Sequence, residues 1–148
     1  MRGDSSAGPD TEVDGKDRDI LMEQKFLFIA LGGGLGALAR YSLGGFLQRL
    51  GESNFPWGTF GVNMAGCFLF GLLWALSEKY LFLNGSARLF LLTGFMGAFT
   101  TFSTFIFETG QLLSGGELFL ALMNTGLQIF LGIGLFFAGI FLGRLLSI

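Results

Sequence analysis

Four long apolar segments, separated by short polar links, constrain this chain more than any other feature of its sequence. A helix of about 20 residues crosses a hydrocarbon core about 30 Å thick, and each segment reaches that length. The sequence therefore predicts an all-α membrane protein with four transmembrane helices. These helices are expected over roughly Phe26–Leu47, Gly58–Leu81, Ala87–Leu113 and Glu117–Leu145.

The links and the N-terminal residues indicate the domain organisation. The links Gln48–Trp57, Phe82–Ser86 and Ser114–Gly116 are short, so consecutive helices should run antiparallel, with no soluble domain between them. We expect one four-helix transmembrane domain over residues 25–148. Residues 1–24 are polar and of mixed charge, which predicts a disordered tail. They lack the charged start and the apolar core of a signal peptide.

The residue types present exclude several classes of function. The chain has 51% hydrophobic and 14% charged residues, no histidine and a single cysteine. This composition excludes an intrachain disulfide, the usual His/Cys metal sites and a Cys–His nucleophile pair. Acid–base catalysis has few candidate residues, and no basic surface is present. We therefore expect neither an enzyme nor a nucleic-acid-binding protein.

The third segment contains an unusual block, TGFMGAFTTFSTFIF, over Thr93–Phe107. Its two glycines and the Thr100–Thr101 pair lie where a membrane helix can be interrupted. An interruption frees backbone groups, which protein, water or an ion must satisfy. Phe102 and Phe105 are three residues apart and share a helix face. The block therefore predicts a broken helix with an ion site and part of a pore wall, in preference to a simple aromatic core.

Glycine spacing predicts where helices approach each other closely. Gly32 and Gly36 form a small-xxx-small pair in the first segment. Gly66 and Gly71 lie on the second segment. Small residues of this kind allow two helix backbones to come together in a membrane.

Two polar side chains lie within the first two segments. A guanidinium at Arg40 needs a partner or water, unless it snorkels to the interface near the helix end. Asn63 follows Thr59 by four residues, and an amide at this depth must find hydrogen-bond partners. Asn63 therefore either lines a polar path or bonds two helices together.

The last two segments contain further polar candidates. Glu108 is the carboxylate well inside the third segment, and Arg40 is one candidate for its partner. In the fourth segment Asn124 and Gln128 are four residues apart, so they share a helix face with Thr125 beside them. These groups either line a pore or bond to a neighbouring helix.

GGxxGAxxRY ends at Tyr41, PWGTxxVNxxG spans Pro56–Gly66, and GxxGxxTTFSTF spans Gly94–Phe105. These three motifs resemble those of the Fluc (CrcB) fluoride channel family. The resemblance covers nearly all of the chain from Phe26 onward, and the third motif is highly specific.

The resemblance implies a four-helix subunit that forms an inverted, dual-topology homodimer in the cell (inner) membrane, with two fluoride pores along the dimer interface. It implies export of fluoride, which protects the cell from its toxicity. It also implies a structural sodium ion at the dimer centre, held by the backbone carbonyls of Gly97 and Thr100 from both subunits. The implied pore-lining residues are Asn63, Phe102, Phe105, Ser103, Thr104 and Thr59.

The chemistry of these side chains agrees with an anion pore. Fluoride is small and strongly hydrated, so a pore must replace its water with donors such as the Asn63 amide and the hydroxyl groups. Phenyl rings have positive edges, which favour an anion weakly. Gln128 departs from the family pattern, because a small hydroxyl residue is usual there.

Two alternatives remain open. A small four-helix dual-topology drug/proton antiporter centres on a carboxylate in its first span, where this chain has Arg40 and no acid. A purely structural membrane protein would account for the glycines but not for the Phe/Thr/Ser block.

Overall fold

The computed structural model describes residues 9–51, 53–79 and 85–146. Its helices are α1 (Pro9–Leu50), α2 (Trp57–Lys79), α3 (Ser86–Arg88), the π-helix η2 (Leu89–Met96), α4 (Gly97–Phe99), α5 (Phe102–Ser114) and α6 (Leu118–Leu146). Among these residues four spans are long and apolar enough to cross a membrane, the third being built from α3 to α5. The predicted all-α architecture of four spans is confirmed.

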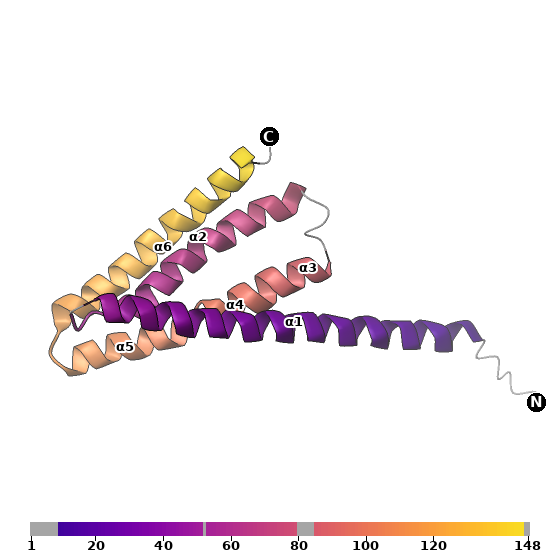
Figure 1. The fold of residues 1–148 in the computed structure, drawn as a ribbon, viewed down its shortest axis with the longest axis horizontal. Coiled ribbons are helices and arrows are strands. Elements are labelled where there is room, and N and C mark those ends of the chain that lie inside the picture. The colour runs from indigo at the N-terminus through magenta and orange to yellow at the C-terminus, as the bar shows by residue number, and fades with distance from the viewer. Residues whose placement is uncertain (1–8, 52, 80–84, 147–148) are drawn as a thin grey trace, which may run out of the picture.

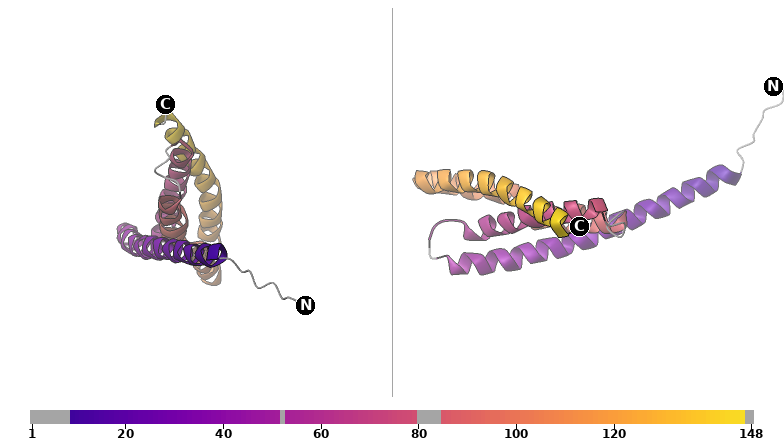
Figure 2. Two further views of the ribbon diagram at one scale, coloured as in Figure 1. Left: turned by 90° about the vertical axis from the view of Figure 1, so that its right-hand side faces the viewer. Right: turned by 90° about the horizontal axis from the view of Figure 1, so that it is seen from above.

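The helices form two main pairs (Figure 1). Helix α2 packs along α6, while α1 runs beside α3, η2 and α4. Helix α5 contacts α6 on the other side of the break in the third span. The right-hand view of Figure 2 shows the N-terminal part of α1 extending beyond the other helices. The middle of the third span therefore lies where the two pairs meet.

Helix α1 begins well before the first apolar segment. The sequence predicts a disordered tail over residues 1–24, whereas in the structure residues 9–24 continue α1. Pro9 is the first helical residue, a position that proline tolerates because its missing N–H needs no partner there. Residues 1–8 lie outside the described residues, as do residues 82–84 of the predicted second link.

Glycines allow both helix pairs to pack closely, as their spacing predicts. A Cβ atom on Gly32 or Gly36 of α1 would overlap backbone oxygen atoms of η2, those of Phe90 and Phe95. On the other pair, a Cβ on Gly71 of α2 would overlap a backbone oxygen of α6. Backbone contact at this distance excludes any side chain, so glycine is required at these crossings.

The third span is broken at Thr100 and Thr101. Thr100 has φ −85° and ψ 159°, and Thr101 has φ −150° and ψ 115°, so both are extended. The predicted interruption of this helix is confirmed. The turns before it form η2, and π-helical segments of this kind occur often at functional sites.

The best-buried apolar cluster lies beside the break. Val62 of α2, Met96 of η2 and Phe99 of α4 are each less than 5% exposed. By contrast, only 11% of the most apolar stretch of α1 and 17% of that of α6 are buried within the chain. The core therefore holds the break in place, while the outer helices present apolar surface to lipid or to a partner.

Candidate functional site

The amide of Asn63 binds the backbone at the break in the third span. Asn63 Oδ1 accepts a hydrogen bond from Thr101 N (2.9 Å), and Asn63 Nδ2 donates to Thr101 O (3.1 Å). One side chain can make both bonds because the N–H and C=O of an extended residue point to the same side. Thr101 is 8% exposed, so α2 supplies an acceptor for a backbone amide that would otherwise be buried without a partner, and a second contact to the Thr101 carbonyl.

The Thr101 side chain starts the second half of the third span. Thr101 is the N-cap of α5, and its Oγ1 accepts a hydrogen bond from Thr104 N (3.3 Å). The same hydroxyl donates to Thr104 Oγ1 (2.9 Å) and lies 3.5 Å from Ser103 Oγ. A threonine cap satisfies one of the free amides at a helix start.

These bonds divert two amides from the carbonyls that they would meet in a continuous helix. In such a helix the Thr101 amide would bond to Gly97 O, and the Thr104 amide to Thr100 O. Here they bond to Asn63 and to the Thr101 hydroxyl instead. The carbonyls of Gly97 and Thr100 therefore lose their helical donors, and carbonyl oxygens are suitable ligands for a hard cation.

A chain of amides extends from Asn63 across α6 to α5. Asn63 Nδ2 donates to Gln128 Oε1 (2.8 Å), and Gln128 Nε2 donates to Asn124 Oδ1 (3.2 Å). Asn124 is fully buried, and its Nδ2 donates to Thr109 Oγ1 (2.9 Å). Within the subunit, Asn124 and Gln128 thus bond to neighbouring helices, one of the two interpretations left open by the sequence.

A groove of about 610 Å³ lies beside this chain of amides. Its walls come from α2, α5 and α6, and they are apolar except around Asn63, Gln128 and the two threonines of the break. Phe102 and Phe105 both line it, with ring centroids 5.5 Å apart. Phe105 is buried at 5% exposed, whereas Phe102 is 74% exposed in the single subunit. The groove therefore combines aromatic walls with a few polar groups.

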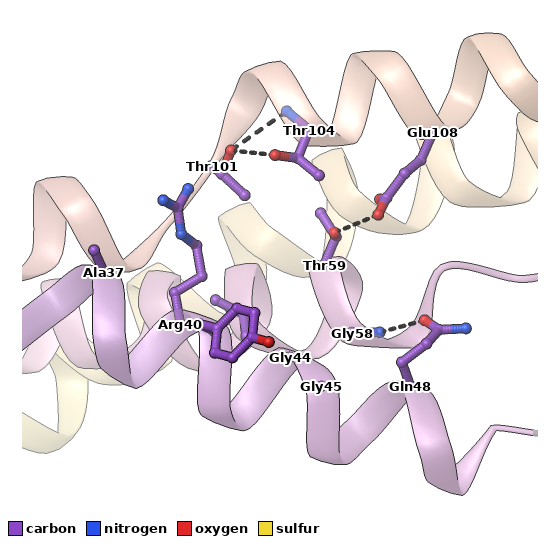
Figure 3. Close-up of a pocket in the computed structure, with 12 residues that line it drawn as sticks. Ala37, Arg40, Gly44, Gly45, Gln48, Gly58, Thr59, Thr101, Thr104 and Glu108 are labelled. Carbon is purple, nitrogen blue, oxygen red and sulfur yellow. Dashed lines mark hydrogen bonds between the residues drawn. The ribbon is translucent and has the colours of Figure 1, made fainter.

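A second cavity of about 440 Å³ lies between α1, α2 and α5, and Thr101 borders both spaces. Figure 3 shows Arg40 extending from α1 towards the break, while Glu108 lies farther along α5. Thr59 Oγ1 donates to Glu108 Oε1 (2.8 Å). Glu108 Oε2 is buried and has no hydrogen-bond partner within the described part of the chain. Arg40 and Glu108 thus face one cavity without forming the pair considered from sequence.

The predicted site residues fall into two groups. Asn63, Phe102, Phe105 and Gln128 lie along the groove, while Thr59, Thr104, Arg40 and Glu108 line the second cavity. Ser103 is exposed on α5, near the Thr101 hydroxyl.

Sequence reasoning recognised Thr101 only as part of the break, although this residue connects the two spaces. A threonine directly before the apolar run that begins at Phe102 is the available sequence signal for a cap.

Comparison with known families identifies the chain. The family model described as "CrcB-like protein, Camphor Resistance (CrcB)" matches residues 27–140. The chain belongs to the CrcB family. Each residue of the two spaces named above lies within the matched range of the CrcB model. With its four apolar spans, this CrcB member is a multi-pass membrane protein.

Several curated relatives carry the name "Fluoride-specific ion channel FluC". The protein of Desulforapulum autotrophicum is 55% identical over 125 residues, which cover 84% of this chain and 100% of the relative. The relative from Solidesulfovibrio magneticus is 53% identical over the same shares. That of Nitrosococcus oceani is 49% identical, again over 84% of this chain and 100% of the relative.

Proposed function

We propose that this protein is a fluoride-selective ion channel, and not an enzyme, that exports fluoride across the cell (inner) membrane and protects the cell from its toxicity. One observation carries the proposal: 55% identity over the whole length of a protein named for fluoride-specific conduction. The groove supports it, because donors and aromatic rings line an otherwise apolar space.

The proposed path has several weak ligands, one after another. Asn63 at the groove is a donor, as are the hydroxyls of Ser103 and Thr104 at the start of α5, and these donors replace part of the hydration shell of fluoride. The ring edges of Phe102 and Phe105 carry partial positive charge and keep the path narrow and dry. Conduction requires sites weak enough to release the ion, and a row of such sites meets this requirement. Thr59, with Thr104, continues the polar lining into the second cavity.

We propose that a sodium ion binds at the break. The carbonyls of Gly97 and Thr100 are its expected ligands, because the amides of Thr101 and Thr104 are directed elsewhere. Two carbonyls from each of two subunits would give four oxygen ligands. When bound, the ion would tie the two broken helices together at the dimer centre. Replacing sodium by a large organic cation should therefore weaken the dimer, as measured by subunit exchange.

We propose that the partner is a second, inverted copy of this chain. Phe102 and Phe137 line the groove, yet they are 74% and 61% exposed in one subunit, so a second surface is needed to enclose an ion. Single cysteines at Ser86→Cys and Ser114→Cys, in a Cys67→Ser background, report the two ends of the third span. Each should label about half of the molecules from either side of the membrane. Labelling of every molecule from one side would contradict the inverted dimer.

Fluoride efflux from liposomes containing the purified protein tests the function directly. We expect fluoride to leave with a selectivity that excludes chloride, measured in paired experiments with the two anions. If liposomes that contain folded, dimeric protein release no fluoride, the proposal is wrong. Proton-driven uptake of an organic cation in the same liposomes would instead support the antiporter alternative.

A further inference from the structure

Both hydrogens of the Asn63 amide nitrogen are already used in the structure. One bonds to Thr101 O (3.1 Å) and the other to Gln128 Oε1 (2.8 Å). A side-chain amide has only two N–H donors. An anion that binds Asn63 must therefore replace one of these two acceptors.

The two acceptors differ in how firmly they are held. Thr101 is joined to Asn63 by two bonds, through its carbonyl and its amide, and it is buried. Gln128 is joined to Asn63 by one bond, lines the groove and is only partly buried. Its side chain also has three rotatable bonds, so it can move without moving the backbone. Gln128 is therefore the acceptor that an anion displaces.

Asn63, Gln128 and Asn124 form a row of hydrogen-bonded side-chain amides. The groups at the two ends of this row determine how each amide is oriented. At one end the Thr101 amide can only donate, so it must meet Asn63 Oδ1. At the other end the Phe105 carbonyl can only accept, so the Thr109 hydroxyl donates to it (2.8 Å) and accepts from Asn124. Asn124 then presents Oδ1 to Gln128, which leaves Gln128 Oε1 facing Asn63. The acceptor, and not the donor, of Gln128 therefore faces the amide of Asn63.

We propose that Gln128 is an internal competitor of the conducted anion, which occupies the Asn63 N–H until an ion displaces it. This inference rests on the proposed function and adds a residue that sets the rate of conduction. Gln128 acts through Asn63, so it is a positioning residue. A net intramolecular hydrogen bond corresponds to a factor of about three to ten, which is the expected size of its effect.

The first test compares fluoride efflux from liposomes containing Gln128→Ser, Gln128→Met and the wild-type protein. The serine variant lacks the Gln128 amide oxygen and most of the side-chain volume at this position. The methionine variant lacks the oxygen but keeps much of the side-chain volume. Both variants should conduct fluoride about three to ten times faster. Thr125→Val is the matched control on α6, because the Thr125 hydroxyl bonds only to Ala121 O in its own helix. That control should conduct at the wild-type rate.

Equal or slower flux in folded, dimeric Gln128 variants, from a wild-type protein that conducts, would overturn the inference. Slower flux would mean that Gln128 is itself a ligand of the ion. If the serine variant fails to fold, the methionine variant decides. A wild-type protein without flux would instead contradict the proposed function.

A second readout does not depend on conduction. The chain has four asparagines, so isotopic labelling of asparagine nitrogen gives few side-chain amide signals in solution NMR. The Asn63 signals are identified by their loss in Asn63→Asp. Fluoride should shift them in Gln128→Met at a concentration about three to ten times lower than in the wild-type protein. If the two proteins need the same fluoride concentration for this shift, Gln128 does not compete with fluoride for the Asn63 amide.

Discussion

Single residues at the break perform more than one task. Asn63 pairs with both backbone groups of Thr101 and also faces the groove. Its replacement would leave the Thr101 amide without its partner, at a cost of about 1–3 kcal/mol if the amide stays buried. A loss of flux in Asn63→Ala therefore has to be separated from a loss of folding.

Thr101→Val tests the cap at the residue scale. Valine keeps the shape of threonine but removes the oxygen that bonds to the Thr104 amide. Loss of a threonine cap costs about 1 kcal/mol, so thermal unfolding in detergent should occur at a lower temperature. Thr125→Val is the control, because its hydroxyl caps no helix. Equal unfolding temperatures for the two variants would contradict the role of the cap.

The two groove phenylalanines should respond differently to replacement by leucine. Phe102 is 74% exposed and Phe105 is 5% exposed within the subunit. Aromatic edge contacts contribute about 0.5–1.5 kcal/mol, so either change should slow fluoride efflux several-fold. Only Phe105→Leu should also lower the unfolding temperature of the subunit. Unchanged efflux in both variants would exclude the ring edges from the path.

At the scale of elements, the third span depends on its neighbours for its shape. Asn63 of α2 holds Thr101, and a Cβ on Gly66 of α2 would overlap Thr100 Cγ2. Gly94 of η2 lies against α1, where an added Cβ would be 2.8 Å from Ile29 O. The break is thus fixed by α1 and α2 together, and not by the local sequence alone.

Alanine at glycines of α6 tests the close crossing with α2. A Cβ on Gly139 would overlap Phe68 O and lie 2.9 Å from Leu72 N, whereas a Cβ on Gly134 would have no atom within 4 Å. Gly139→Ala should therefore separate the helices and lower the unfolding temperature. Gly134→Ala should be neutral or should stabilise by up to about 1 kcal/mol, since glycine within a helix is unfavourable. If Gly139→Ala and Gly134→Ala destabilise the protein equally, the predicted close contact of α6 with α2 at Gly139 is wrong.

At the scale of the whole molecule, the chain has four membrane spans and a helical N-terminal extension before the matched family region. The family model begins at residue 27, and the relative from Desulforapulum autotrophicum aligns in full over 125 residues. The first part of α1 extends beyond the other helices (Figure 1). The structural features of the proposed pore therefore lie in residues 25–148.

A shortened chain that begins at Met22 tests this division. We expect it to fold, to form the same oligomer in size-exclusion chromatography and to conduct fluoride at the full-length rate. The physical reason is that none of the groove or cavity residues precedes Ala37. A failure to assemble would assign a structural role to the removed extension.

Some features of the fold and site are predictable from the sequence because they depend on local properties. Hydropathy identifies the four spans, since each must match the thickness of a bilayer. The glycines and the Thr100–Thr101 pair indicate the break, since they weaken a helix at that point. The start of α1 at Pro9 was not predicted, because a polar composition does not distinguish a disordered segment from the continuation of a long helix.

Other features were decided by the tertiary structure. Asn63 meets Thr101 across 38 residues and Gln128 across 65, and no local pattern specifies such partners. Arg40 and Glu108 carry opposite charges and would attract each other, yet Glu108 accepts a hydrogen bond from Thr59 instead. Hydrogen bonds require a short distance between donor and acceptor and a nearly straight geometry. The way α2, α5 and α6 pack therefore determines which polar groups meet, whereas the sequence by itself determines only that each one needs a partner.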